Sequence, residues 1–282
     1  MMYEVKSRRV LNSVTKMLIV SAPDVAKTCK AGQFVVVRVN ETGERIPLTI
    51  ADFDRARGLI TLVFQEVGKS TKLLGSLDVG TSILDVVGPL GKPTDADRKY
   101  GTVVVIGGGC GTAICYPVAK AFKASGNYLI TINGARSADL LIFRKEMQAI
   151  SDEMYETTDD GTCGVHGFVT TVLSDLIQKG RKIDLVFAVG PVPMMKFVSK
   201  TTEPQKIHTV VSLNSLMVDA TGMCGACRVT VGGQMRFTCV DGPDFDGHLV
   251  DYNELMGRLN AYKEQETTAD TRWNEAHGGR KQ

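Results

Sequence analysis

Short apolar segments separated by glycine and proline make up residues 1–97. Three segments rich in branched and aromatic side chains favour β-strands: Met17–Val20, Gln33–Val39 and Leu59–Val67. The turn-forming residues around them are Gly43, Pro47, Gly58, Gly68, Gly80, Gly88, Pro89 and Gly91. Short strands at this spacing predict an antiparallel β-barrel or sandwich, with one short helix over Thr71–Leu77.

Beyond residue 98 the strands become apolar throughout and alternate with helical segments. The predicted strands are Thr102–Ile106, Tyr128–Ile132 and Asp184–Val189. The predicted helices are an alanine-rich segment that ends near Ala124, then Leu140–Met154 and Thr170–Lys179. Strands that are apolar on both faces and separated by helices are typical of a parallel sheet covered on both sides. Residues 98–204 are therefore expected to form an α/β unit.

A third, smaller unit over residues 205–262 is rich in glycine and cysteine and ends in a predicted helix, Asp251–Ala261. Residues 263–282 are polar and are expected to form a tail. The single tryptophan, Trp273, lies in this tail, where local packing cannot bury it. We expect it either to be loose or to dock on a partner, and we favour docking.

Composition and charge narrow the class of partner. The 282 residues are enough for two domains, each with its own core. The 33 basic and 31 acidic residues give a net charge of +2, so nothing electrostatic favours nucleic acid or an anionic membrane as the main partner. No apolar run reaches the ~20 residues of a membrane span, and the N-terminal segment lacks the apolar core of a signal peptide. A cytoplasmic protein is expected, and there closely spaced cysteines favour metal or redox chemistry.

The strongest chemical signal is the spacing Asp219-x4-Cys224-x2-Cys227-x11-Cys239. Plant-type [2Fe-2S] sites use the spacing C-x4-C-x2-C followed by a more distant cysteine. Here that spacing is kept, but aspartate stands in the first position. Small residues in the loop let the backbone curl around a cluster, and a hairpin that turns at Gly232-Gly233 returns Cys239 to the loop. The predicted ligands are therefore Asp219, Cys224, Cys227 and Cys239.

Other interpretations of these four residues remain open. Three cysteines and an aspartate also suit Zn²⁺ in an interaction module without redox activity. A cluster with a different fourth ligand is a further alternative, and free structural thiols are another. If Asp219 does bind iron, its carboxylate is a harder ligand than a thiolate. It is then expected to shift the reduction potential and to make that position labile and pH-sensitive.

Two glycine-containing turns at the ends of apolar strands predict a nucleotide site. The first contains Gly107, Gly108, Gly109, Gly111 and Thr112, and the second contains Gly190, Pro191 and Met194. A glycine turn between a strand and a helix lets the backbone approach a pyrophosphate, although a tight structural turn gives the same pattern. Because ligands bind at the carboxyl ends of parallel strands, Arg136 and Asp160 are further candidates for NAD(P) contacts.

With these motifs in this order, residues 3–262 resemble the ferredoxin-NADP reductase superfamily, in the branch of dihydroorotate dehydrogenase electron-transfer subunits. The resemblance implies an FAD-binding barrel, an NAD(P)-binding α/β domain and a [2Fe-2S] domain. The family's flavin-binding strand corresponds to Arg45, Pro47, Leu48 and Thr49. Its pyrophosphate turn corresponds to Gly68, Ser70 and Thr71, and its adenosine-ribose contacts to Val63, Phe64 and Gln65.

Three departures from the family pattern stand out. The arginine of the flavin strand, Arg45, comes one residue early, since Ile46 occupies its usual place. Val189 stands where the reductases carry a catalytic cysteine, a tolerable loss because flavin and nicotinamide carry the chemistry of hydride transfer. Asp219 replaces the first cluster cysteine of the dihydroorotate dehydrogenase subunits, which points to the branch of NADH-dependent ferredoxin:NADP⁺ oxidoreductases.

The resemblance to that branch implies electron transfer between NAD(H), FAD and a [2Fe-2S] cluster. It also implies a larger partner subunit with a second flavin and [4Fe-4S] clusters, in a heterodimer or higher assembly that performs electron bifurcation and reaches ferredoxin through the complex. The alternative is an electron-transfer subunit that serves a dihydroorotate dehydrogenase or a sulfide dehydrogenase. The choice between NAD and NADP stays open, because Arg136 would either meet a 2′-phosphate or be a solvated loop residue.

Overall fold

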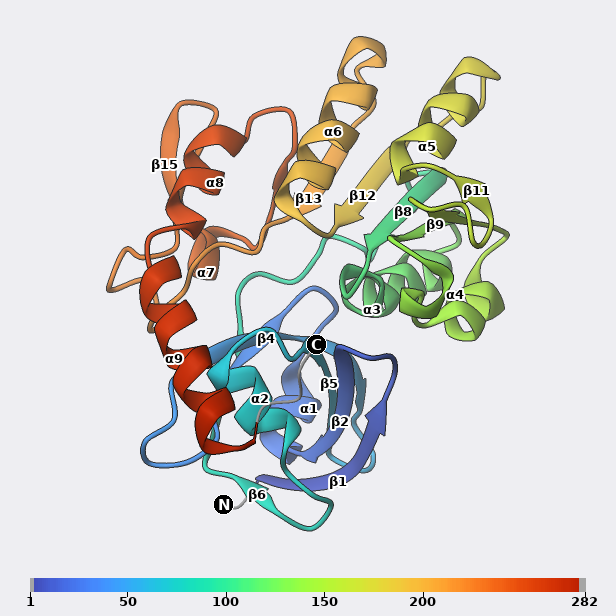
Figure 1. Cartoon of the computed structure of the whole chain (residues 1–282). Helices are drawn as coiled ribbons and strands as arrows, with labels where there is room; N and C mark the ends of the chain where they lie inside the picture. Colours follow the sequence, from blue (N-terminus) through green and yellow to red (C-terminus); the bar gives the residue numbers. More distant parts are fainter. Residues whose placement is uncertain (1–2, 279–282) are drawn as a thin grey trace.

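The computed structural model describes residues 3–278. Figure 1 shows a curled antiparallel sheet made by the N-terminal strands and, above it, a parallel sheet flanked by helices. A smaller unit containing the C-terminal cysteines lies beside the parallel sheet, and helix α9 (Lys263–Ala276) runs from this unit down to the barrel. The predicted fold class, a β-barrel followed by an α/β domain and a small third unit, is confirmed.

The barrel owes its closure to a very short connection between its two edge strands. Its elements are β1 (Tyr3–Val10), β2 (Thr15–Ser21), α1 (Pro23–Thr28), β3 (Phe34–Arg38), β4 (Ile46–Asp54), β5 (Leu59–Gln65), α2 (Lys69–Gly75), β6 (Ser82–Ile83) and β7 (Asp85–Leu90). Their order in the sheet is β6-β1-β2-β5-β4-β3-β7. Only Leu84 separates β6 from β7, so the two edges of the sheet come together. Alternate side chains such as Val35, Val37 and Leu62 fill the interior.

The parallel sheet is built from strand-helix units. Its elements are β8 (Thr102–Gly108), α3 (Gly111–Ala124), β9 (Tyr128–Ala135), η1 (Ala138–Leu140), α4 (Arg144–Ile150), β10 (Glu153–Thr158), β11 (Val165–His166), α5 (Val169–Gln178), β12 (Leu185–Val189), α6 (Val192–Thr202), η2 (Glu203–Gln205) and β13 (Thr209–Ser212). The strand order is β11-β10-β9-β8-β12-β13-β16, and the last strand, β16 (Asp244–Asp246), is antiparallel. The sheet therefore includes strands on both sides of residue 204.

Side chains that alternate along the strands build a separate core on each face of this sheet. On one face Val105 and Leu129 pack with Phe122 of α3. On the other face Val104 packs with Leu173 of α5. Because the strands are apolar on both faces, the sheet needs helices on both sides, as the sequence predicts.

The third unit is organised around the predicted hairpin. Its elements are β14 (Arg228–Val231), β15 (Gln234–Phe237), α7 (Thr238–Asp241) and α8 (Tyr252–Leu259). Gly232 and Gly233 both take positive φ, 57° and 74°, which a two-residue hairpin turn of this kind requires. The hairpin prediction is therefore confirmed, and the chain continues from β15 directly into the short helix that carries Cys239.

The helix predicted over Leu140–Met154 is wrong in extent. Helix α4 spans only Arg144–Ile150, because Phe143 takes a left-handed backbone before it and Ser151 is extended after it. Met154 belongs instead to β10, which pairs with β9 in the parallel sheet. Strand pairing between distant segments decides this stretch, and local spacing cannot reveal such pairing.

The polar tail is also more ordered than predicted. It forms α9 as far as Ala276 and lies against α2 of the same chain, and Trp273 is half-buried on it. Residues 279–282 of the predicted tail lie outside the described residues. Neither α9 nor any other helix within residues 3–278 has the length and apolar character that a membrane span requires.

A buried carboxyl group, that of Asp244, joins the segment after the barrel to the edge of the parallel sheet. Thr94 donates a hydrogen bond to Asp244 Oδ2 at 2.5 Å, and the Thr94 amide donates to the carbonyl of Ala31 in the barrel at 2.9 Å. The other oxygen, Asp244 Oδ1, is buried without a hydrogen-bond partner among the described residues. Burial raises the pKa of Asp244 to about 6.

We expect Asp244→Asn to stabilise the protein near pH 7 and much less near pH 4. Because the pKa of Asp244 is higher in the folded protein than in the unfolded chain, the stability of the fold falls as pH rises from about 4 to about 6. Above that pH the loss stays at about 3 kcal/mol. Asparagine stays neutral and keeps an oxygen that accepts from Thr94. Urea unfolding at both pH values measures this, and an equal gain at both would contradict it.

Candidate functional site

Two of the predicted cluster ligands are in contact. The sulfurs of Cys227 and Cys239 lie 3.2 Å apart, and each residue is 2% exposed. Cys227 follows the loop and Cys239 lies in α7, so the β14–β15 hairpin brings the two together. Burial, followed by the neighbouring Cys227 thiol, raises the pKa of Cys239 to about 12. Metal binding at this pair must therefore displace protons from the sulfurs.

The other two predicted ligands form a second pair on the exposed side of the loop. One oxygen of Asp219 accepts from the amide of Thr221 at 2.9 Å, and the other accepts from the amide of Cys224 at 3.1 Å. The backbone N–H groups of Thr221 and Cys224 hold the pKa of this carboxyl below its usual range, so it is ionised. The Cys224 side chain is exposed beside it.

This arrangement in two pairs bears on the kind of metal. Within residues 3–278, no three His, Cys, Asp or Glu side chains lie close enough together to hold a single metal ion. A tetrahedral zinc site requires such a group of four ligands. A [2Fe-2S] cluster has two irons, and the protein supplies two ligands to each. The pairs Asp219–Cys224 and Cys227–Cys239 match this division of four ligands into two pairs.

The buried cysteine pair packs directly on the barrel. Cys227 and Cys239 share an apolar cluster with Phe34 and Val36 of β3. Strand β3 pairs in turn with β4, placing Phe34 opposite Thr49 and Val36 opposite Pro47. Only one strand therefore separates the predicted cluster ligands from the predicted flavin strand.

Strand β4 has an open edge where the flavin is expected. Over residues 46–49 it pairs with β3 alone, and its pairing with β5 begins at Ile50. Pro47, Leu48 and Thr49 are all partly exposed, and Arg45 is exposed just before the strand. A strand with one unpaired edge offers backbone N–H and C=O groups to a planar ring. These residues therefore fit the isoalloxazine of FAD.

The predicted pyrophosphate turn is shaped by its own side chains. The Thr71 hydroxyl accepts from the amides of Val67 and Gly68 at 3.1 and 3.2 Å and so fixes the turn. Ser70 donates to Glu44 at 2.6 Å, which brings the turn beside the loop that carries Arg45. These contacts gather the predicted phosphate-binding residues at one end of the barrel.

The three predicted adenosine contacts are placed differently from one another. Val63 and Phe64 are 4% and 2% exposed, and their side chains are part of the apolar packing. Only their backbone is available to a ligand. Gln65 lies in the large cleft between the barrel and the parallel sheet.

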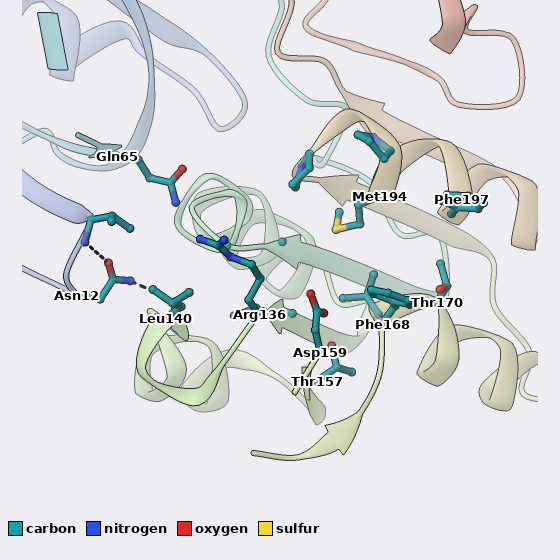
Figure 2. A pocket seen from close by; sticks show the side chains of 18 residues that line it. Asn12, Gln65, Arg136, Leu140, Thr157, Asp159, Phe168, Thr170, Met194 and Phe197 are labelled. Atoms are coloured by element: carbon teal, nitrogen blue, oxygen red, sulfur yellow. Dashed lines mark hydrogen bonds between the residues drawn. The ribbon is translucent and has the colours of Figure 1, made fainter. Parts of the chain in front are cut away.

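That cleft has a volume of about 700 Å³ and opens at the carboxyl ends of the parallel strands. Figure 2 shows Asn12 and Gln65 on the barrel side, Arg136 and Asp159 on the strand ends, and Met194 on α6. The predicted residues Gly108, Gly109 and Pro191 also line it. An elongated dinucleotide fits a cleft of this size and position.

The glycines of the two turns serve both packing and access. A Cβ at Gly107 would lie 2.6 Å from the Thr112 backbone, and one at Gly111 would lie 2.3 Å from the Val189 carbonyl oxygen. A Cβ at Gly190 would meet Met194. Gly109, with φ of 56°, has open space around it and faces the cleft. Close packing therefore requires glycine at positions 107, 111 and 190. Gly109 is the position with open space for a ligand.

The ends of β9 and β10 contribute one charged residue each to the cleft. One of them, Asp159, is not the residue that we predicted. Arg136, a predicted NAD(P) contact, lines the cleft. Asp160 does not line it, and its carboxylate accepts from Thr162 instead. The neighbouring Asp159 lines the cleft in its place, beside the exposed aromatic ring of Phe168. The sequence gives the Asp159-Asp160 loop but not which carboxylate turns inward, and no spacing signal marks Phe168.

Comparison with known proteins identifies the third unit and the whole chain. Residues 214–251 match the iron-sulfur cluster binding domain of dihydroorotate dehydrogenase B. The chain is 48% identical, over 259 residues, to a dihydroorotate dehydrogenase B (NAD⁺) electron transfer subunit homolog of Thermotoga maritima, across 92% of this chain and 91% of that protein. The chain belongs to the family of dihydroorotate dehydrogenase B electron-transfer subunits and their homologues.

Other members of this family and one solved structure agree. The electron transfer subunit of Geobacillus thermodenitrificans is 32% identical across 86% of this chain and 94% of its own length. A chain in the structure of an NADH-dependent reduced ferredoxin-NADP oxidoreductase that performs flavin-based electron bifurcation matches with a TM-score of 0.92 and 45% identity, over 97% of this chain and 98% of that chain. The predicted family resemblance is therefore confirmed. The chain is the electron-transfer subunit of an oxidoreductase and uses FAD, NAD(H) and an iron-sulfur cluster.

Proposed function

We propose that this chain is the electron-transfer subunit of an electron-bifurcating, NADH-dependent ferredoxin:NADP⁺ oxidoreductase. When bound, FAD supplies hydride exchange with NAD(H) and single-electron exchange with the cluster. The observation that carries the proposal is the packing of Cys227 and Cys239 on β3, one strand away from the flavin strand β4. The chain thereby holds the nicotinamide cleft, the flavin strand and the cluster cysteines around one barrel.

Within this proposal the four cluster ligands are Asp219, Cys224, Cys227 and Cys239. Asp219 and Cys224 would hold one iron, and Cys227 and Cys239 the other, following the two pairs in the structure. FAD would lie on the open edge of β4, with its phosphates toward Gly68–Thr71.

A larger partner subunit with a second flavin and [4Fe-4S] clusters would exchange electrons with this chain, and ferredoxin would act through that complex in the cytosol. The cysteine loop is available for such a contact, since Cys224 is exposed and Met223 beside it is 89% exposed. Purification of the chain from its native cells, with mass and metal analysis of the intact complex, tests the partner. A partner without [4Fe-4S] clusters would contradict it.

Service to a dihydroorotate dehydrogenase is the second candidate. It is favoured by the matched electron transfer subunits that carry this name, such as that of Geobacillus thermodenitrificans. The higher identity to the ferredoxin-NADP oxidoreductase chain, 45% against 32%, and the aspartate at position 219 favour the first candidate. Co-purification of a dihydroorotate-oxidising subunit would reverse this order.

Asp159 supports NAD(H) rather than NADP(H) as the nucleotide. Figure 2 shows its carboxylate turned into the cleft near Phe168, whereas the Arg136 guanidinium extends toward Gln65 of the barrel. A carboxylate at the end of a parallel strand accepts from the hydroxyls of an adenosine ribose and repels a 2′-phosphate. Arg136 would then meet the pyrophosphate, which both dinucleotides share.

We expect Asp159→Asn to weaken binding of ADP-ribose about tenfold, through loss of hydrogen bonds to a charged acceptor, and to strengthen binding of its 2′-phosphorylated form. Titration calorimetry with both ligands measures this without any redox step. Asp160→Asn is the matched control, because it removes the same charge one residue away but outside the cleft lining. Equal effects of the two variants, or tighter binding of the phosphorylated ligand by the unmodified protein, would contradict a preference for NAD(H).

A further inference from the structure

Helix α9 spans the distance between the unit that carries the cysteines and the barrel (Figure 1). Its sequence is mostly polar and none of its residues is buried, which is typical of a helix that bridges units rather than one that builds a core. Its half-buried residues are Ala269, Asp270, Trp273 and Asn274. They recur one turn apart, so they form one face of the helix.

This face of α9 contacts α2 through a single lysine. The Lys72 ammonium donates to Asp270 Oδ1 at 2.6 Å and to Asn274 Oδ1 at 2.9 Å. Asn274 donates in turn to the second oxygen of Asp270 at 3.2 Å. The Lys72 and Asp270 side chains are 22% and 27% exposed, so the pair is better shielded from water than most surface ion pairs.

Helix α2 is short and depends on its neighbours. A helix that spans only Lys69–Gly75 is not stable alone. On one side Leu74 is buried in the barrel core, and on the other side Lys72 meets α9. The segment Gly68–Thr71, where the FAD phosphates are proposed to lie, includes the first three residues of this helix.

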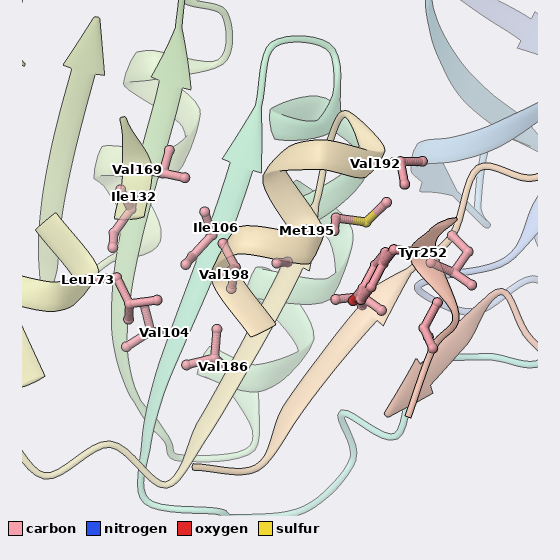
Figure 3. Packing of buried hydrophobic residues seen from close by; sticks show 14 of the residues in the cluster. Val104, Ile106, Ile132, Val169, Leu173, Val186, Val192, Met195, Val198 and Tyr252 are labelled. Carbon is pink, nitrogen blue, oxygen red and sulfur yellow. The ribbon is translucent and has the colours of Figure 1, made fainter. Parts of the chain in front are cut away.

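The other end of the connection is fixed by α8. Tyr252 is buried with Met195 and Val198 of α6 (Figure 3), and its hydroxyl lies 2.8 Å from Ser199 Oγ. At the far end of α8, Arg258 donates to the carbonyl of Ala226 in the cysteine loop at 3.0 Å. The segment from α8 to α9 therefore contacts the cluster loop at one end and α2 at the other.

We propose that α9 is a brace for the flavin, in which Asp270 and Asn274 act through Lys72 to hold α2 and the turn Gly68–Thr71 in place. Asp270 is thus a positioning residue for FAD, although it lies on a helix far along the chain from the barrel. The inference rests on the proposed function, because it takes FAD to lie at that turn. It further implies that the position of the flavin is tied to that of the cluster loop.

The test is the rate of FAD release from the full-length holoprotein, followed by the rise in flavin fluorescence after dilution. Asp270→Lys places a second ammonium beside Lys72, and we expect FAD release to become about tenfold faster. Glu275→Lys is the matched control, since it makes the same charge change at an exposed position on the opposite side of α9, and we expect less than about a twofold change. The exchanged pair Lys72→Glu with Asp270→Lys restores opposite charges and should restore slow release.

Each outcome separates the brace from the wider proposal. Equal release rates in Asp270→Lys and Glu275→Lys would overturn the brace, as would failure of the exchanged pair to restore slow release. In the second case, the charge of Lys72 itself, and not its link to α9, would hold the flavin. If the unmodified protein neither contains FAD nor takes it up, the proposed function itself fails.

Discussion

The variant Cys227→Ala is expected to lose the iron-sulfur cluster while retaining FAD. Cys227 is buried, and its sulfur touches that of Cys239, so alanine removes one of the two ligands of the proposed inner iron. Apart from the proposed ligands Cys224 and Cys239, the nearest cysteine along the chain is Cys163, far outside this unit. FAD binding should persist, because the flavin strand and the phosphate turn belong to the barrel.

Iron and acid-labile sulfide per FAD, with the visible spectrum, measure this loss. Iron should fall from two per chain to near zero. Cys115→Ala is the matched control: Cys115 is also buried, but it lies in α3 under the parallel sheet, and its removal should leave the iron content unchanged. Full iron in Cys227→Ala would mean that the cysteine motif does not hold the cluster.

The variant Asp219→Cys is expected to keep a [2Fe-2S] cluster and to lower its reduction potential, on the order of 100 mV. A thiolate donates more electron density to iron than a carboxylate does, and therefore stabilises the oxidised cluster. The Asp219 carboxylate already lies beside Cys224, 3.1 Å from its amide, so a cysteine there restores the usual spacing without moving the loop.

Redox titration followed by electron paramagnetic resonance measures that potential. Asp241→Asn provides the control, because Asp241 is an acidic residue of α7 that accepts from the Phe237 amide and is not a proposed ligand. Removing its negative charge should raise the potential slightly, the opposite direction to Asp219→Cys. An unchanged potential in Asp219→Cys would show that Asp219 does not bind iron.

Features of the fold that are determined by residues close together in the sequence can be predicted from it. The strand Thr102–Ile106 can be predicted because a buried parallel strand must be apolar. The glycine turn after it can be predicted because a Cβ atom would collide with the neighbouring backbone there. The hairpin at Gly232-Gly233 is readable for the same reason, since its positive φ values favour glycine.

The features that the sequence hides depend on distant contacts. Strand β10 exists because β9 pairs with it, and α9 is placed against α2 by Lys72, almost two hundred positions earlier in the chain. The direction of each carboxylate in the Asp159-Asp160 loop is set by Thr162 and the cleft, which no spacing rule records. Cluster ligands are easier to recognise than nucleotide contacts because their chemistry restricts them to few residue types.

The central claim is that nicotinamide, flavin and cluster exchange electrons within this one chain. An anaerobic titration of the purified protein with NADH, followed by visible absorption and electron paramagnetic resonance, tests it most directly. We predict that NADH bleaches the flavin and then produces the signal of a reduced [2Fe-2S] cluster, and that this signal is absent in Cys227→Ala although the flavin still bleaches. A colourless protein, or one in which NADH leaves both the flavin and the cluster oxidised, would contradict the claim.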